Sequence, residues 1–331
     1  PLLPLLILPA PRGAGLGFIG APIAITLRDV TCCTISFCLA PCWLRRNRSD
    51  GAWPRWRRWR PALTGWGEVL RLGLPGCIMT WSEWFGWEAN LFLAGTLCAS
   101  DAAADGGEGG CAPVEAFPIL SNLMVISFFV HFGFSQAQST LIGNAMGEGR
   151  WRDARRIAAT GGTFVVSLAT LAAAALVAGR HHAGALFVGD GADTAHLRAL
   201  VARALPAVAG YVVLDSIGPS FAHQTIFGLG VPLRLPAALN FLSFWVVAIP
   251  IGAVIATRGG LGLLGLWLGL DLGMLLLVCG VLTYIGCLDW RAAAERAAKR
   301  AQGDSAVGRL AGRDGAAEVA AAADEGGDAA L

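Results

Sequence analysis

The sequence is poor in charge. Only 15% of its 331 residues are Asp, Glu, Lys or Arg, whereas 55% are hydrophobic. A soluble domain carries about a quarter charged residues, so the low charge excludes an ordinary soluble protein, and the high apolar fraction excludes a disordered chain. Gly is frequent but has no three-residue period, which excludes collagen. The apolar residues fall in long uncharged blocks that need lipid around them, so the sequence predicts a polytopic membrane protein.

Motifs of soluble enzymes are also missing. The nine cysteines lie mostly in apolar blocks without CxxC or Cys/His spacing, so they are interpreted as small hydrophobic residues, with neither a disulfide framework nor a zinc site. GLGFIG at 15–20 and GLGLLG at 260–265 match the dinucleotide fingerprint, but no strand precedes either. They are better interpreted as small residues that let membrane helices pack closely. No nucleophile or metal spacing emerges, so we expect a protein that is not an enzyme and holds no cofactor or metal.

Seven blocks are long enough to span a bilayer, which takes about 20 apolar residues in a helix. The sequence therefore predicts an all-α integral membrane protein with about seven transmembrane helices, at roughly 14–43, 72–98, 116–146, 157–179, 199–229, 231–257 and 261–287.

The arginines indicate the orientation of these spans, because positively charged loops stay cytoplasmic. Basic residues gather after the first, third and seventh blocks, which places the C-terminus in the cytoplasm. The loop WPRWRRWR at 53–60 could bind nucleic acid by stacking and charge. Between two membrane spans, an anionic inner leaflet is the better partner for its Trp and Arg side chains, so we expect the lipid bilayer and no nucleic acid as partner.

The informative residues are acids within predicted spans. A charged carboxylate in lipid costs several kcal/mol unless it is paired, hydrated or protonated, which makes each such acid a functional candidate. Asp29 follows Arg28 directly and is interpreted as locally neutralised, whereas Asp271 stands alone and could be a polar contact between helices. Two further candidates, Glu83 and Glu88, share one span. Their separation of five residues places them about 140° apart on a helix, so they need not share one site.

Tryptophans accompany these two glutamates in MTWSEWFGWEAN. Trp87 follows Glu83 by four residues and lies on its face, and Trp84 relates in the same way to Glu88. An aromatic wall beside an acid is the chemistry of organic-cation recognition, through the ring quadrupole and the countercharge. An acid withdrawn from water also exchanges protons more readily near neutral pH. We predict a substrate cavity lined by Trp84, Trp87, Gln136 and Gln138.

Four segments resemble eukaryotic transporters of the MATE (multidrug and toxic compound extrusion) family. RLGLPGCIMTWSEWFGWEANLFLAGTL at 71–97 is similar to their seventh transmembrane helix, and STLIGNAMGEGRWRDARRIA at 139–158 to the end of the eighth. LNFLSFWVVAIPIG at 239–252 resembles the eleventh helix, and the stretch from GLWLGLDLG to the alanine-rich helix, at 265–300, resembles the twelfth and its exit.

The resemblance implies two six-helix lobes facing each other in a V, of which this chain carries the sixth helix and the C-terminal lobe. The N-terminal lobe, absent here, is then an expected partner, together with small organic, cationic substrates. The implied organisation is a stub at 1–12, the sixth helix at 13–44, a basic linker at 45–70, the C-lobe at 71–289 and a cytoplasmic tail at 290–331, first a short helix and then disordered.

Site roles follow from the same resemblance. Glu83 matches the family's acid that is implicated in proton or sodium coupling and in substrate binding. Glu88 matches the second acid of that helix, and Trp84 matches the adjacent aromatic residue. Asp215 matches the acid of the tenth helix. His131 departs from the family, because many members have Pro at this position. The charges of Arg28, Asp29 and Asp271 also depart from it.

We therefore predict a secondary antiporter that exports organic cations, drugs or metabolites in exchange for protons, with sodium as the alternative coupling ion, in the plasma or vacuolar membrane. One alternative is an inactive or regulatory fragment. Another is a lipid-linked precursor flippase of the same superfamily, which would want cationic cavity residues to hold a diphosphate, whereas these spans offer mainly acids.

Overall fold

The computed structural model describes residues 17–46, 66–105, 111–189 and 191–299. These ranges are dominated by helices and contain no strand. The chain divides into two compact units, Pro1–Val69 and Leu70–Leu331. The predicted stub at 1–12, the loop at 53–60 and the tail beyond residue 299 lie outside the described residues.

The first unit contains one described helix, α2 (Gly17–Arg46). Its polar groups are satisfied locally. The hydroxyls of Thr26, Thr31 and Thr34 each donate to the carbonyl four residues earlier, and Arg28 Nη2 lies 2.8 Å from Asp29 Oδ1. This pairing agrees with the interpretation of Asp29 as a locally neutralised acid.

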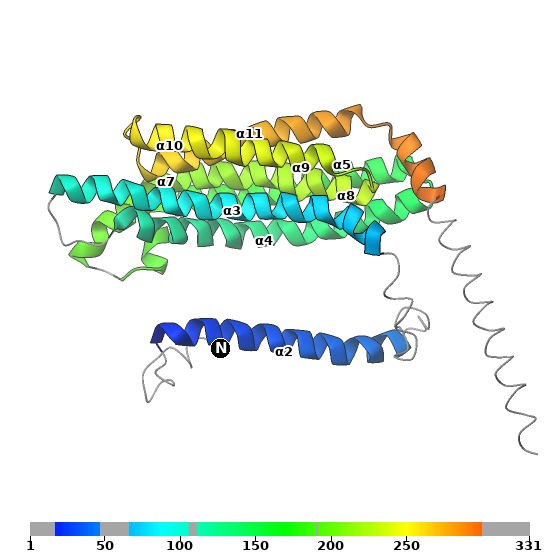
Figure 1. Ribbon diagram of the computed structural model, residues 1–331, viewed down its shortest axis with the longest axis horizontal. Coiled ribbons are helices and arrows are strands. Elements are labelled where there is room, and N and C mark those ends of the chain that lie inside the picture. The colour runs from blue at the N-terminus through cyan, green and yellow to red at the C-terminus, as the bar shows by residue number, and fades with distance from the viewer. Residues whose placement is uncertain (1–16, 47–65, 106–110, 190, 300–331) are drawn as a thin grey trace, which may run out of the picture. The chain divides into compact units, whose positions relative to one another are not determined.

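The second unit holds the remaining helices, except that the helix beginning at Trp66 starts four residues before it (Figure 1). Within the described residues each predicted apolar block is mainly helical, so the predicted all-α class is confirmed. The elements are α3 (Trp66–Asp105), α4 (Ala112–Gly147), α5 (Trp151–Ala178), α6 (Arg180–Ala183), η3 (Gly184–Leu186), α7 (Ala192–Asp215), η4 (Ser216–His223), α8 (Gln224–Leu229), α9 (Arg234–Phe241), η5 (Leu242–Ala248), α10 (Ile249–Thr257) and α11 (Leu263–Cys287), followed by a helix at 290–299.

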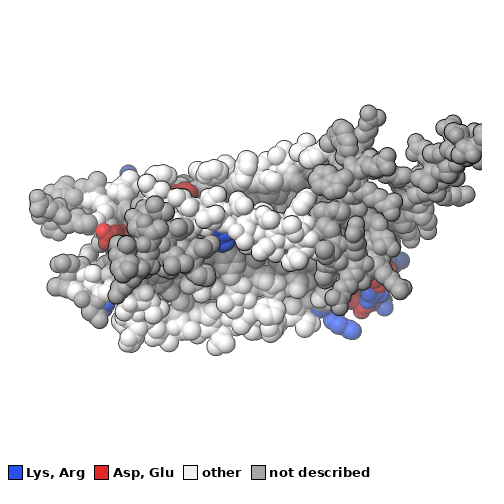
Figure 2. Space-filling model, turned by 90° about the horizontal axis from the view of Figure 1, so that it is seen from below, with Lys and Arg blue, Asp and Glu red and all other residues white. Residues whose placement is uncertain are grey.

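Six helical stretches among the described residues are long and apolar enough to cross a membrane. Helix α3 is not among them although it has 40 residues, because its middle contains Glu83, Glu88 and three tryptophans that lower its mean hydropathy. Most described side chains on the face in Figure 2 are uncharged; a cluster of acidic and basic side chains lies near one end, and a few isolated charged side chains lie elsewhere. Both features are those of a helical membrane protein.

Two long helices change their winding in the middle. The segments η4 and η5 are π-helical. Pro219 lacks the N–H that an α-helix would donate to the carbonyl of Asp215, and Pro250 lacks the one for Val246, so the regular ladder cannot continue through either segment. The first of these changes begins directly after an intramembrane acid.

Small residues bring α10 and α11 into close contact. A Cβ added to Gly265 would lie 2.5 Å from the backbone nitrogen of Ala256, and one added to Gly269 would overlap Gly252. The interpretation of GLGLLG as a helix-packing segment therefore fits the structure at Gly265.

Helix α3 approaches the other helices less closely than they approach one another. Its bulky side chains bridge the gap: Trp87 reaches the core around Tyr211 and Trp267, and the backbone carbonyl of Ser82 accepts a hydrogen bond of 3.1 Å from Trp245 Nε1. The space beside α3 is what leaves room for a cavity.

One cysteine expectation is wrong. Cys98, near the end of α3, and Cys111, directly before α4, form a disulfide with a Cα–Cα distance of 5.4 Å. The pair lies at the two ends of the sequence segment 99–110, which is rich in glycine and contains three acidic residues. Their separation of 13 residues in the sequence carries no recognisable motif, because the pairing depends on how α3 and α4 are brought together.

Candidate functional site

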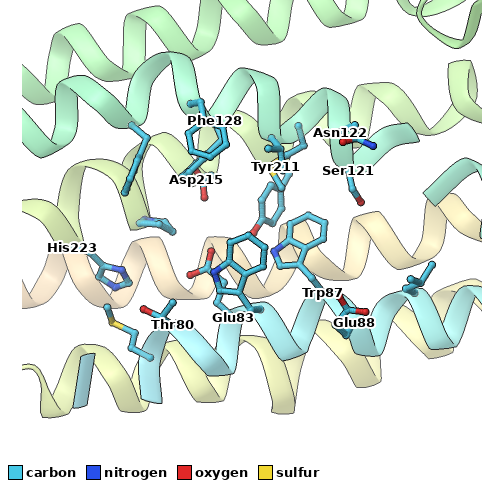
Figure 3. Close-up of a pocket in the computed structure, with 18 of the residues that line it drawn as sticks. Thr80, Glu83, Trp87, Glu88, Ser121, Asn122, Phe128, Tyr211, Asp215 and His223 are labelled. Atoms are coloured by element: carbon cyan, nitrogen blue, oxygen red, sulfur yellow. The ribbon is translucent and has the colours of Figure 1, made fainter. Parts of the chain in front are cut away.

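A cavity of about 420 Å³ lies between α3, α4 and the helix that runs through α7, η4 and α8 (Figure 3). Its walls are mostly aromatic and apolar, and Lys and Arg are absent from the residues that line it. The lining residues are Met79, Thr80, Glu83, Trp84, Trp87, Glu88, Leu91, Phe117, Pro118, Ser121, Asn122, Met124, Val125, Phe128, Phe129, Phe132, Tyr211, Asp215, Pro219, His223, Gln224 and Phe227.

The acids predicted from the sequence converge on this cavity. Glu83 extends from the middle of α3 and is half-buried, and Asp215, at the end of α7, is 2% exposed. Figure 3 shows the two carboxyl groups directed toward one another across the cavity, with the hydroxyl end of Tyr211 pointing toward α3 beside them. Glu88 lines the same cavity, but it is exposed. The structure thus gathers residues that are more than 130 positions apart in the sequence.

Asp215 has two polar neighbours on the protein side. Ser220 Oγ donates to Asp215 Oδ2 over 3.3 Å, and His131 Nε2 lies 3.5 Å from the same oxygen. His131 is fully buried and does not line the cavity. Because η4 is π-helical, it places Ser220, five residues after Asp215, where its hydroxyl reaches the carboxylate.

The two predicted tryptophans have different surroundings. Trp87 packs edge-on against Tyr211 and Trp267, with ring centroids 5.2 and 5.4 Å apart, and so forms a fixed wall of the cavity. Trp84 also lines the cavity, but it is 64% exposed. Trp84 is therefore free to adapt to a bound molecule, whereas Trp87 is held in place.

Not every predicted residue belongs to this cavity. Gln136 and Gln138 lie outside its lining, which corrects their placement. Gln138 is buried and donates to Thr225 Oγ1 over 3.0 Å, and Gln136 is exposed. Both positions are polar in an apolar helix, and sequence alone does not show which face of α4 meets the cavity. Asp271 also lies outside the cavity, with its carboxyl near Gly210.

The cavity also contains residues that the sequence analysis did not select. Tyr211 precedes Asp215 by one helical turn and so shares its face, a spacing that could have identified it. Ser121 and Asn122 line the wall from α4, and nothing in their local sequence distinguishes them. No group of three His, Cys, Asp or Glu side chains among the described residues is arranged to hold a metal ion.

Comparison with known sequences finds similarity to transporters. Residues 107–254 match the family model described as MatE. Multidrug and toxin extrusion protein 1 of Homo sapiens is 27% identical over 282 residues, which cover 85% of this chain and 45% of that protein. An uncharacterized transporter of Schizosaccharomyces pombe is 26% identical over 270 residues, covering 82% and 46%. The chain spans about half the length of these relatives.

Solved structures show the same fold. The crystal structure of the eukaryotic MATE transporter AtDTX14 matches with a TM-score of 0.70 and 22% identity, over 87% of this chain and 59% of that one. The outward-facing conformation of a multidrug resistance MATE family transporter matches with a TM-score of 0.64 and 19% identity, over 86% and 58%. The family-model match, the relatives and the fold agree with the resemblance of the four sequence segments, and the chain is a multi-pass membrane protein with the fold of MATE transporters.

Proposed function

We propose that this chain supplies the substrate-binding and proton-binding lobe of a secondary antiporter that exports organic cations. The observation that supports it is the convergence of Glu83 and Asp215 on one aromatic cavity inside an apolar helical bundle. Carboxylates in such a position are expensive unless they serve a cation or a proton. The names of the human and other relatives, which describe multidrug and toxin extrusion, agree with this proposal.

Charge and shape together favour an organic cation as the substrate. Aromatic faces attract a cation through their quadrupole. A carboxylate in an apolar cavity supplies the countercharge, and it attracts the cation more strongly than in bulk water because the effective dielectric constant is lower. Trp84, Trp87 and Glu83 line the same cavity, so one bound molecule can contact all three side chains. A cavity of about 420 Å³ is in the range of drug-sized ligand pockets.

Competition for the carboxylates couples the two fluxes. A cation binds when Glu83 and Asp215 are ionised, and protonation removes the countercharge and favours release. Binding must therefore weaken as the pH falls and the acids take up protons. We propose the proton rather than sodium as the coupling ion, since largely aromatic walls favour neutral carboxyl groups. Exchange across the plasma or vacuolar membrane, with the C-terminus in the cytoplasm, belongs to the same proposal.

The absence of Lys and Arg from the residues lining the cavity disfavours a lipid-linked precursor flippase. A diphosphate is held best by fixed cationic donors, above all arginine. The three acids that line the cavity, Glu83, Glu88 and Asp215, would repel such a group.

Binding of tetraphenylphosphonium to the 331-residue chain in lipid nanodiscs tests the proposal. The cation is followed by calorimetry and by quenching of the cavity tryptophans. Glu83→Gln, which keeps the size of the side chain, is expected to weaken binding about tenfold or more, a loss of roughly 1.4 kcal/mol. Glu115→Gln removes an exposed acid of α4 outside the cavity and is expected to bind as the unaltered chain does.

Two results would refute the proposal. The first is an affinity for tetraphenylphosphonium that is the same in Glu83→Gln and in the unaltered chain. The second is binding that does not weaken between neutral and acidic pH, because proton competition is the core of the coupling.

A further inference from the structure

The pair formed by His131 and Asp215 is a buried polar contact whose histidine the transport proposal does not use. The two side chains are 0% and 3% exposed, and His131 Nε2 lies 3.5 Å from Asp215 Oδ2. Neither nitrogen of His131 makes a hydrogen bond within the part of the chain that the structure describes. A buried polar group without a partner lowers the free energy of unfolding. The carboxylate of Asp215 is the polar neighbour that can offset this loss for the buried imidazole of His131.

The two groups occupy different sides of the cavity wall. Asp215 lines the cavity, whereas His131 lies behind it. The ring of Phe128, which does line the cavity, stands edge-on to the imidazole at a centroid distance of 5.7 Å, and Phe132 stacks on Phe128 at 4.5 Å. These rings separate His131 from the cavity, so a bound cation reaches Asp215 but not the histidine.

The backbone keeps Asp215 in this position. Because Pro219 interrupts the α-helical ladder directly after Asp215, the winding changes to π-helical in η4. The hydroxyl of Ser220 then donates to the carboxylate oxygen that faces His131. The carboxylate is held from one side by a neutral donor and from the other by a group that can carry a proton.

Few other titratable groups face the pair. Helix α3 contributes Glu83, α7 contributes Tyr211, η4 contributes His223 and α11 contributes Asp271, the last beside Gly210. Helix α8 carries no titratable side chain, and those of α5 lie in its first two turns. Among the described groups facing Asp215, His131 is therefore the one base within ion-pair distance.

We propose that His131 is a positioning residue that holds one proton jointly with Asp215, behind the wall of the cation cavity. This inference rests on the proposed function and deepens it. The proton moves between imidazole Nε2 and carboxylate Oδ2, so the pair is neutral whether it exists as imidazolium and carboxylate or as imidazole and carboxylic acid. When the proton leaves to water, the pair carries one negative charge that faces the cavity through Asp215. His131 thus acts on the substrate through Asp215 and does not touch it.

This arrangement assigns the two acids different tasks. Glu83 faces the cavity from α3 and contacts the cation directly, whereas Asp215 with His131 stores the exchanged proton. Replacing His131 is then expected to change how many protons leave on cation binding, with a smaller effect on the affinity at high pH, where both acids are ionised.

Nitrogen-15 NMR of the histidines tests the pair without any ligand. The chain has five histidines, so a nanodisc sample labelled at histidine gives few signals, and His131→Gln identifies the one from His131. In Asp215→Asn, the His131 imidazole is expected to take up its proton at a pH lower by about one unit or more, since an opposite charge within 4–6 Å favours the protonated form. An unchanged His131 titration in Asp215→Asn would overturn the proposal.

Two controls separate proton sharing from a structural effect. Ser220→Ala removes a neutral donor to Asp215 and is expected to shift the His131 titration much less than Asp215→Asn does. His196→Gln removes an exposed histidine of α7 and is expected to leave it unchanged. If His131→Gln does not fold, a chain in which the other four histidines are replaced provides the assignment instead.

Calorimetry of tetraphenylphosphonium binding in buffers of different ionisation enthalpy gives the second readout, the number of protons released per cation. His131→Gln is expected to bind the cation and release fewer protons than the unaltered chain, and an equal release overturns the proposal. A chain that binds no cation but whose histidine responds to Asp215→Asn refutes the proposed function while the pair remains. A chain that binds cation but shows no such response refutes the pair alone.

Discussion

Replacing Gly265 by Ala tests how closely α10 and α11 pack. A Cβ at this position would lie 2.5 Å from the backbone nitrogen of Ala256 and 2.6 Å from its Cα. Carbon atoms pack at about 3.5–4.0 Å, so the two helices must separate by about 1 Å. The obstacle is backbone, which has no rotamer to change. We expect Gly265→Ala to destabilise the lobe by about 1–3 kcal/mol, the range for overpacked cores.

Gly286 provides a matched control on the same helix, because nothing lies within 4 Å of a Cβ added there. Alanine favours a helix over glycine by up to about 1 kcal/mol, so Gly286→Ala is expected to be neutral or stabilising. The assay is thermal unfolding of the purified chain in one detergent, followed by size-exclusion chromatography of the surviving monomer. The two variants should shift the melting temperature in opposite directions. A Gly265→Ala chain as stable as Gly286→Ala would refute the close packing.

Four further predictions concern the cavity and its surroundings. Trp84→Leu is expected to weaken tetraphenylphosphonium binding by roughly 2- to 30-fold, corresponding to a cation–π contribution of about 0.5–2 kcal/mol, with little change in melting temperature. Trp87→Leu should lower both affinity and melting temperature, because its ring also packs on the core; an unchanged melting temperature would contradict this difference. Pro219→Ala restores an N–H donor and is expected to weaken cation binding by moving Asp215. An affinity equal to that of the unaltered chain would disprove this expectation. Cys98 and Cys111 are expected to react with maleimide only after reduction, and labelling without reduction would argue against the disulfide.

Part of the candidate site could be predicted because its signals are local. Glu83 and Trp87 stand four residues apart, so their shared face follows from helix geometry alone. Asp215 was identifiable because an acid inside an apolar block is expensive in lipid. Gln136 and Gln138 were misplaced for the opposite reason: a polar side chain on a long apolar helix can face a cavity, a neighbouring helix or the surface, and Gln138 faces Thr225.

The sequence by itself determined the membrane class and the helical blocks. Long apolar runs can satisfy their backbone hydrogen bonds in lipid only as helices, and this constraint does not depend on which helices become neighbours. The cost of an intramembrane carboxylate is equally independent of its partners, so the acids Glu83, Glu88 and Asp215 are recognisable from their apolar surroundings in the chain.

Only the tertiary structure decided the contacts between helices. His131 and Asp215 are 84 positions apart, and their approach depends on the packing of α4 against α7 and on the π-helical winding of η4. The disulfide between Cys98 and Cys111 also depends on how the helices pack, and so does the larger separation of α3 from the other helices that leaves room for the cavity. Such contacts arise from the shapes of side chains on several helices at once, so no local pattern in the chain encodes them.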